Sequence, residues 1–201
     1  MSVSRFIDPV RLEGPRFAVI EPLQREHVPE LIDAARDGEL WRLWYTTVPS
    51  PEQMASVVDT LLAQRERDGI LPFVVRHRGD GRIVGATRYM NVDAANRRLE
   101  IGGTWVAAST QRSGLNTECK WLLLQHAFEQ LNCIAVELRT HVLNQRSRRA
   151  IERIGARLDG ILRHHMIMPN GTVRDTALYS ITNDDWPTVK VHLQWLMDQP
   201  R

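Results

Sequence analysis

The fold of this chain is decided by the stretch LEIGGTWVAASTQRSGLN, residues 99–116. Residues 99–106 are an apolar, β-prone run, and residues 107–116 are a polar loop that contains Gly114. A helical pattern follows, in which side chains recur at three- and four-residue steps on one face, at Thr117, Trp121, Leu124, Phe128 and Leu131. A loop in this place presents backbone N–H groups at the start of a helix, where the helix dipole also favours negative charge. The stretch therefore predicts a strand, a loop able to bind phosphate, and a helix.

The loop and the motifs around it resemble the GNAT acetyltransferase superfamily. Residues 111–116, QRSGLN, are similar to the pyrophosphate loop of that superfamily, Q/R-x-x-G-x-G/A, with Asn116 where Gly or Ala is commoner. Three further motifs stand in the family's order, namely EIG at 100–102, NQRS at 144–147 and IGA at 154–156. The resemblance covers about residues 12–186 and is strongest to the RimJ/RimL-like branch, which acetylates the N-termini of ribosomal proteins.

Length and composition indicate a single globular domain over residues 1–201, with a core at about 12–186 and a C-terminal helix at about 184–197. The chain has 43% hydrophobic and 25% charged residues and a formal net charge of +2, which argues against nucleic acid as a partner. It has no apolar run long enough to span a bilayer, and residues 1–16 carry charges where a signal peptide would be apolar. We therefore expect a cytoplasmic protein without a membrane partner. The two cysteines, Cys119 and Cys133, give no disulfide framework or metal spacing and are interpreted as core residues.

Periodicity and turn signals predict an α/β (α+β) fold with a mixed, mostly antiparallel, seven-stranded sheet. The strands are expected at about 17–20, 71–77, 83–90, 99–106, 134–140, 158–168 and 173–181. The helices are expected at about 26–36, 50–69, 117–131, 144–155 and 184–197. The order of strand, helix and strand over 99–140 predicts one parallel, right-handed β-α-β crossover. The resemblance also implies helices on both faces of the sheet and central strands that are splayed to admit the cofactor.

The resemblance implies acetyl-CoA as cofactor and direct transfer of the acetyl group to an amine in a ternary complex. It assigns the pyrophosphate to the loop and the pantetheine arm to backbone groups of the central strand and to an Asn after the next strand. The predicted cofactor-binding residues are Trp105, Val106, Gln111, Arg112, Ser113, Gly114, Leu115, Asn116 and Asn144. Asn144 can equally be the N-cap of a short helix, and the two roles are compatible.

Removal of the proton from the amine has two candidate residues. Glu100 resembles the acidic residue that some relatives use, through water, as a base, although it can also be an ordinary charge near Arg97 and Arg98. His141 is an alternative base. Many GNAT enzymes place a Tyr, which protonates the departing thiolate, seven residues after the Asn, but this chain has Ile151 there. The ribosomal-protein branch also lacks that Tyr, and the resemblance to it implies that Ser147 takes this role. The Ser147 hydroxyl can also belong only to the capping turn.

By position in the family, the acceptor pocket would include Trp41, Trp44, Tyr45, His141, Asp175 and Tyr179. Aromatic residues in a loop can instead complete a core. His164 and His165 point to opposite faces of a strand, and no metal site is expected.

The sequence therefore predicts an acetyl-CoA-dependent N-acetyltransferase that acts on a primary amine, either a protein N-terminus or a small molecule. Because Ile151 carries no proton, a CoA-binding sensor or scaffold without turnover is the alternative. Neither G-x-G-x-x-G nor G-x-x-x-x-G-K-[ST] occurs, which disfavours a nucleotide-binding regulator. The sequence does not name the acceptor amine and leaves a homodimer open.

Overall fold

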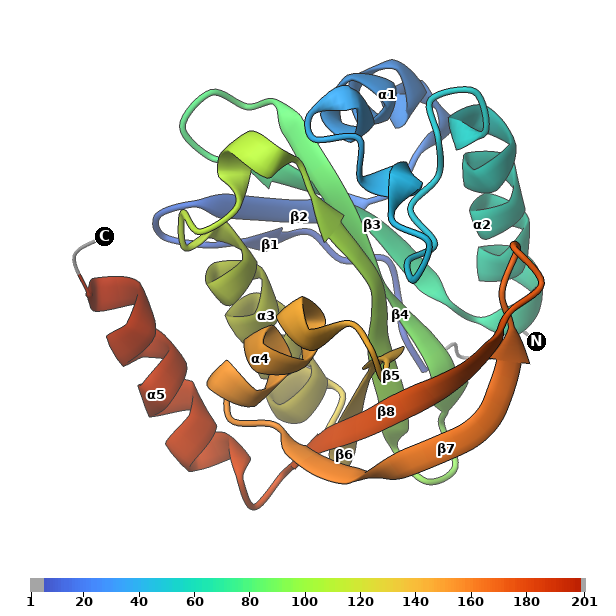
Figure 1. Cartoon of the computed structure of the whole chain (residues 1–201). Coiled ribbons are helices and arrows are strands. Elements are labelled where there is room, and N and C mark those ends of the chain that lie inside the picture. The colour runs from blue at the N-terminus through green and yellow to red at the C-terminus, as the bar shows by residue number, and fades with distance from the viewer. Residues whose placement is uncertain (1–5, 200–201) are drawn as a thin grey trace, which may run out of the picture.

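The computed structural model describes residues 6–199 and is built on one mixed sheet of eight strands in the order β1-β2-β3-β4-β5-β6-β8-β7 (Figure 1). Neighbouring strands are antiparallel except β5 and β6, which are parallel, as predicted for the crossover. The strands are β1 Leu12–Glu13, β2 Ala18–Pro22, β3 Leu71–His77, β4 Ile83–Asp93, β5 Arg98–Val106, β6 Ala135–His141, β7 Arg157–Ile167 and β8 Val173–Thr182. The outermost residues of the predicted 1–201 domain, 1–5 and 200–201, lie outside the described part of the chain.

The prediction of seven strands was wrong by one strand. The extra strand, β1, has two residues, which pair with Ile20 and Val19 of β2. Two residues are too few for an alternating pattern to reveal a strand, so only the long-range pairing with β2 defines it.

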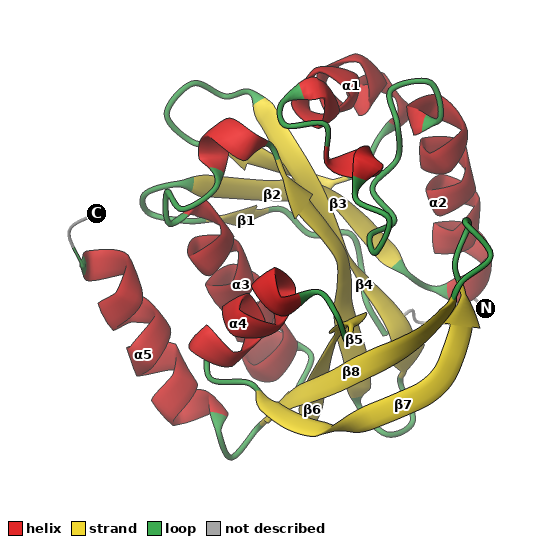
Figure 2. Cartoon of the chain, viewed as in Figure 1, coloured by secondary structure: helices red, strands yellow, loops and turns green. Residues whose placement is uncertain are grey.

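The helices cover both faces of the sheet (Figure 2). Adjacent strand residues point to opposite faces. On β4, Tyr89 donates a 2.6 Å hydrogen bond to the Leu123 carbonyl of helix α3 (Leu115–Gln125), whereas Arg88 lines a cavity with Met54 and Val58 of helix α2 (Met54–Asp68). Helices α2 and α3 therefore lie on opposite faces. The helices are α1 Val28–Arg36, α2 Met54–Asp68, α3 Leu115–Gln125, α4 Gln145–Arg153 and α5 Trp186–Asp198, with shorter helical turns at Arg25–His27, Leu40–Arg42, Ala108–Thr110 and His126–Gln130.

Local signals account for most helix ends. Gly69 ends α2 with a φ of 67°, and Gly155 follows α4 with a φ of 94°. Both residues have the left-handed conformation that commonly ends a helix and that glycine adopts without strain. The predicted start of α2 at Ser50 was early, because residues 50–53 form a turn in which the Gln53 N–H donates to the Ser50 carbonyl. The pattern predicted over 117–131 is continued beyond α3 by a π-helical turn, His126–Gln130.

The parallel strands β5 and β6 form a wedge. They pair only at their starts, from Arg98 opposite Ala135 to Glu100 opposite Glu137. Beyond Glu100 both strands continue without pairing to each other, β5 to Val106 and β6 to His141. The strands therefore diverge from Glu100, which lies at the vertex, and this divergence matches the splay that the resemblance implies.

A β-bulge lies on the β5 side of this wedge. Two residues of β5, Gly103 and Thr104, stand opposite Thr87 of β4, and Gly103 has a φ of 58°. A bulge with a left-handed glycine adds a residue to one strand and re-aims the side chains beside it. The bulge therefore changes the direction of the β5 side chains that lie close to the vertex.

Both cysteines are buried, as predicted, with Cys119 and Cys133 each 2% exposed. Burial raises the pKa of the Cys119 thiol to about 12 and that of Cys133 to about 11, so both stay protonated and unreactive near neutral pH. In residues 6–199, none of the helices combines the length and apolar character needed to cross a bilayer.

Candidate active site

The predicted phosphate loop lies at the open end of the wedge. After β5, the 3₁₀ turn Ala108–Thr110 leads into the loop, in which Arg112 and Gly114 have positive φ values of 65° and 97°. The Ser113 hydroxyl donates to the Thr110 carbonyl at 2.6 Å, and Gly114 is the N-cap of α3. The first N–H groups of a helix have no intrahelical partner, so the start of α3 is suited to bind an anion at this end.

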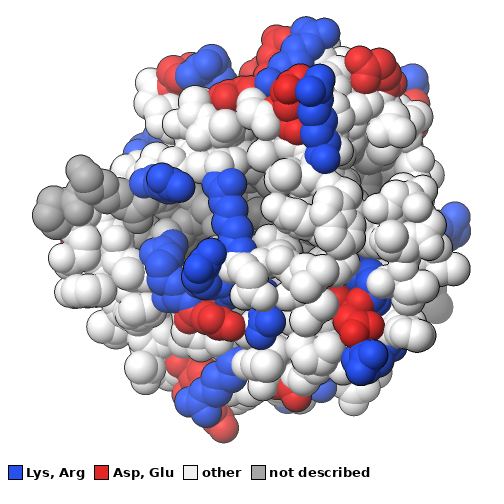
Figure 3. Space-filling model, in the orientation of Figure 1, with Lys and Arg blue, Asp and Glu red and all other residues white. Residues whose placement is uncertain are grey.

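Arginines gather beside this loop. Helix α4 carries Arg146, Arg148, Arg149 and Arg153, and Figure 3 shows Lys and Arg side chains around a hollowed area over the start of α3 and α4. Arg146 also donates to the Gln111 side-chain oxygen, which joins α4 to the loop. Positive charge and helix N–H groups thus occur together at the open end, a combination that suits a pyrophosphate.

Two further contacts bear on the predicted cofactor residues. The Gln111 amide donates a 2.9 Å hydrogen bond to the Val106 carbonyl, so a pantetheine arm that pairs with that carbonyl must use its second lone pair or displace the amide. The Asn116 side-chain oxygen is buried and has no hydrogen-bond partner among the described residues. A buried acceptor without a donor is costly, so this atom fits a ligand that brings a donor such as an amide N–H.

Asn144 is the N-cap of α4, as predicted. Its side-chain oxygen accepts a 3.0 Å hydrogen bond from the Ser147 N–H. Ile151 lies one turn beyond Ser147 and is buried. The Ser147 hydroxyl is therefore held on the first turn of α4, and the Ile151 position supplies no proton.

At the vertex, Glu100 is a buried carboxylate with two polar partners. The Asn91 amide donates to it at 2.7 Å, and the Arg139 Nε lies 3.3 Å from the same oxygen. Burial raises the pKa of Glu100 above its ordinary value, although Arg139 and the Asn91 hydrogen bond oppose the shift. Such a carboxylate suits a base that must take a proton near neutral pH.

Glu100 belongs to a row of charged side chains that crosses the sheet on the face of α1 and α2. The row runs over five strands through Arg88, Glu100, Arg139, Arg174 and His165. Arg174 and His165 both contact the Thr176 hydroxyl, at 2.8 and 3.0 Å. Of this acid and arginine group, only Glu100 was predicted from the sequence. The signal that could have revealed the arginines is a charged residue at a core-facing position of an apolar strand, such as Arg88 in residues 83–90.

Another of the missed residues is a buried amine beside the bulge. Lys120 of α3 donates a 2.9 Å hydrogen bond to the Thr104 hydroxyl, and burial lowers the pKa of Lys120 to about 8. Lys120 lies among the buried positions of α3. A lysine among the apolar residues of a helical pattern is unusual and could have indicated this group from the sequence.

His141, Trp44 and Tyr45 come together, as expected for one pocket. The Trp44 ring lies 5.2 Å from the His141 ring and 5.7 Å from the Tyr45 ring, and Trp44 is 48% exposed. His141 is buried, and its Nδ1 accepts a 3.1 Å hydrogen bond from the Leu143 N–H. The neutral ring therefore carries its proton on Nε2, which can donate but not accept. Trp41 packs against the hydrophobic core from the turn Leu40–Arg42.

Tyr179 and Asp175 do not join this group. Tyr179 is fully buried, and its hydroxyl accepts from Arg148 and donates to Glu152, both on α4, so it faces away from Glu100. Asp175 accepts from the His164 N–H at 2.8 Å and pairs with Arg163, which holds an irregular part of β7. Their positions give no support to the predicted roles in the acceptor pocket.

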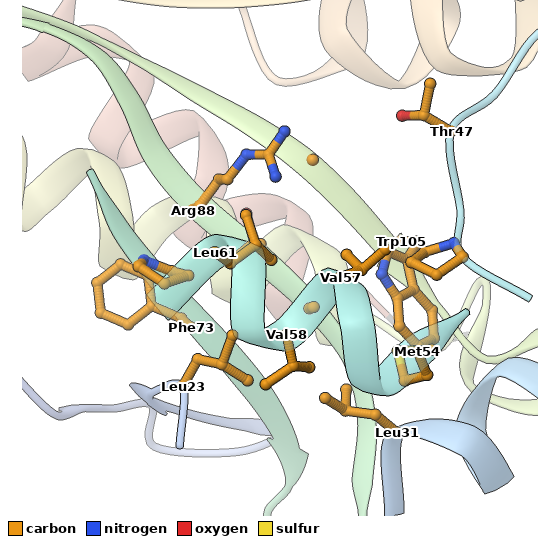
Figure 4. Close-up of a pocket in the computed structure, with 15 residues that line it drawn as sticks. Leu23, Leu31, Thr47, Met54, Val57, Val58, Leu61, Phe73, Arg88 and Trp105 are labelled. Carbon is orange, nitrogen blue, oxygen red and sulfur yellow. The ribbon is translucent and has the colours of Figure 1, made fainter. Parts of the chain in front are cut away.

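A small apolar cavity lies beside the row, between α1, α2 and strands β3–β5. It encloses about 60 Å³ and is lined mainly by aliphatic side chains, with the Trp105 ring at one end. Figure 4 shows the Arg88 side chain on one side of this cavity and the side chains of Leu31 and Met54 on the other. The cavity therefore places an apolar surface on this face of the sheet, next to the charged row.

The comparison with protein families identifies the class of protein that this fold and site define. Residues 18–157 match the model of the acetyltransferase (GNAT) domain, and the chain belongs to that family of N-acetyltransferases. YdaF of Bacillus subtilis (strain 168), whose name assigns it provisionally to the ribosomal N-acetyltransferases, is 28% identical over 84% of this chain and 91% of its own length.

Solved structures agree with this assignment. A GCN5-related N-acetyltransferase from Brucella melitensis is 30% identical, with a TM-score of 0.82 over 95% of this chain and 86% of that one. RimJ of Mycobacterium smegmatis, solved in complex with CoA-disulfide, shares the fold at 24% identity, with a TM-score of 0.77 over 94% of this chain and 95% of that one.

Proposed function

We propose that this protein transfers the acetyl group of acetyl-CoA to a primary amine by direct attack in a ternary complex. The observation that carries the proposal is the wedge between β5 and β6, which has the loop 111–116 at its open end and the buried Glu100 at its vertex. A cofactor held by its pyrophosphate at the loop would extend toward the carboxylate. This arrangement places the phosphate end and the proton acceptor at the two ends of one path.

In this proposal the start of α3 and Arg146 bind the pyrophosphate, and the buried Asn116 oxygen accepts a hydrogen bond from the cofactor. Glu100 removes a proton from the acceptor ammonium so that the neutral amine can attack. Glu100 is better suited to this role than His141, because the His141 Nδ1 already accepts the Leu143 N–H. Ser147 donates a hydrogen bond to the departing thiolate from the first turn of α4.

The alternative is a protein that binds CoA without turnover. The observation in its favour is the buried Ile151, which cannot donate a proton to the thiolate. Release of thiol from acetyl-CoA in the presence of a panel of amines separates the two functions. A protein that binds CoA but releases no thiol with any amine would be the sensor or scaffold.

The test of cofactor binding at the loop is a thermal shift. A ligand that binds only the folded state stabilises it by about 2.7 kcal/mol at a hundredfold excess over Kd, so CoA should raise Tm by several degrees. Gly114→Val places a side chain at a φ of 97° in the loop and should abolish the shift.

The matched control is Gly69→Val, which imposes a similar strain at a φ of 67° at the end of α2, far from the loop in sequence and with open space around it. It should lower Tm but keep the CoA shift. An unchanged CoA shift in folded Gly114→Val would remove the loop from the site.

A further inference from the structure

The charged row contains two guanidinium groups that have no carboxylate partner. Arg88 makes one polar contact, from its Nε to the Met90 sulfur at 3.3 Å, and lies against the Gly103 bulge. Arg174 donates to the Thr176 hydroxyl. In residues 6–199, no Asp or Glu oxygen lies within 4.0 Å of either group.

The third guanidinium of the row is already neutralised. Arg139 pairs with Glu137 at 2.6 Å and contacts Glu100 at 3.3 Å, and Glu137 also binds Arg98 at 2.8 Å. The acidic groups near the vertex are therefore committed to Arg139 and Arg98. Arg88 and Arg174 remain as an excess of positive charge on either side of Glu100.

Both groups are partly buried, and burial lowers the pKa of Arg88 and of Arg174. A desolvated guanidinium without an anion is unfavourable unless a ligand supplies the missing charge. The fork of an Arg side chain matches a carboxylate in two parallel hydrogen bonds. The missing anionic partner of Arg88 and Arg174 is therefore a carboxylate.

The position of Arg88 favours the acceptor over the cofactor as the source of this carboxylate. Arg88 pairs in the sheet with Gly102, two residues from Glu100, whereas the phosphate loop begins after Val106. Its side chain also lies on the face of α2, opposite the face of α3, and lines the apolar cavity. An acceptor whose amine reaches Glu100 would have its neighbouring atoms beside Arg88.

We propose that the acceptor carries a carboxylate on the same residue as its amine or on the next one, and that Arg88, assisted by Arg174, binds this carboxylate. The proposal rests on the proposed function and names its substrate class. Two sources share this chemistry: the α-carboxylate of a free amino acid, and an acidic side chain beside the N-terminus of a peptide.

The test uses acceptors in matched pairs with the full-length protein and acetyl-CoA. One arm compares free amino acids with their amides, and the other compares peptides with Asp or Asn at the second position. In the arm that contains the true source, the carboxylate should raise kcat/KM by about 10- to 100-fold. No preference in either arm would overturn the proposal.

Variants assign the preference to the arginine. Arg88→Met should remove most of the preference, measured as the ratio of kcat/KM for the two members of each pair, and Arg88→Lys should keep part of it. Arg82→Met, at an exposed arginine just before β4, is the matched control and should keep the full preference. An equal loss for acidic and neutral acceptors in Arg88→Met would contradict carboxylate binding. Arg174→Met provides a second variant where Arg88→Met fails to fold.

Binding separates this proposal from the proposed function. The affinity for N-acetylated peptides with Asp or Asn at the second position, and for N-acetyl amino acids and their amides, can be measured by calorimetry without turnover. A protein that binds CoA and prefers the carboxylate ligands but releases no thiol would retain this inference and lose the acetyltransferase function. A protein that releases thiol without any carboxylate preference would do the reverse.

Discussion

At the scale of single residues, Glu100 is the group whose environment has the clearest chemical consequence. Glu100 is 5% exposed, and the attraction of Arg139, whose Nε lies 3.3 Å from the carboxylate, is outweighed by burial, which raises the pKa of Glu100. The base is the deprotonated form. Activity should therefore rise with pH through a pKa above the ordinary value for Glu.

Glu100→Gln should lower kcat by about 10²-fold or more and remove this rising limb, with little change in the affinity for acetyl-CoA. The measurement is the pH profile of acetyl transfer, together with calorimetric CoA binding. Glu21→Gln is the control, because Glu21 is also a partly buried, ion-paired carboxylate but lies on β2.

Near-native turnover in Glu100→Gln would make Glu100 structural. His141→Ala is the parallel experiment and should have the smaller effect, because the His141 Nδ1 accepts the Leu143 N–H. A larger loss in His141→Ala than in Glu100→Gln would reverse the assignment.

At the scale of elements, the first turn of α4 has a structural task and, in our proposal, a chemical one. Asn144 caps the helix through the Ser147 N–H, and this bond uses the backbone of Ser147 and leaves the hydroxyl for another partner. The Arg146 contact with Gln111 joins the same turn to the phosphate loop. Changes to the hydroxyl and to the cap should therefore have different effects.

Ser147→Ala should slow the chemical step by roughly tenfold, about 1.4 kcal/mol, which is near the net value of one hydrogen bond. The cap remains, so CoA affinity should hardly change. Single-turnover acetylation measures the step, and Ser56→Ala on α2, whose hydroxyl bonds the Gln53 carbonyl, is a matched control.

Two outcomes would contradict this role. Unchanged turnover would mean that the thiolate leaves without Ser147, and a fall in CoA affinity would mean that the hydroxyl serves the cofactor. Asn144→Ala should instead reduce the free energy of unfolding by about 1 kcal/mol, the usual cost of losing an N-cap.

At the scale of the whole molecule, one buried carboxylate joins the segment before β2 to the helix that begins at the candidate active site. Glu118 of α3 is 0% exposed and accepts hydrogen bonds from the backbone N–H groups of Arg16, Phe17 and Ala18 at 2.5–3.0 Å. These residues lie about a hundred positions earlier in the chain. The contact joins the start of β2 to the same helix whose start is the proposed anion site.

Glu118→Gln should lower the free energy of unfolding by about 2–4 kcal/mol, because an amide has one acceptor oxygen where the carboxylate has two and adds a donor that faces other donors. Urea unfolding measures the loss, and hydrogen exchange should show faster exchange at residues 16–18. The control is Glu129→Gln, a partly exposed carboxylate bonded to Lys190, which should cost about 1 kcal/mol or less. A small loss in Glu118→Gln would show that packing alone holds this edge.

The sequence by itself determined the features that depend on neighbours along the chain. The helices with their glycine ends at Gly69 and Gly155, the Asn144 cap, the loop 111–116 and the parallel crossover were all predicted, because capping and periodicity act over a few residues. The GNAT family also followed from short motifs in their order.

Only the tertiary structure decided which distant side chains share a face. Strand β1 exists through its pairing with β2, Tyr179 faces α4, and the vertex at Glu100 exists because β5 and β6 stop pairing there. Arg88, Arg139 and Arg174 come from three strands and meet around Glu100 only after the sheet has aligned them. A pattern within one strand shows that a side chain points inward, but strand order and register determine what it meets, and these depend on contacts between residues far apart in the chain.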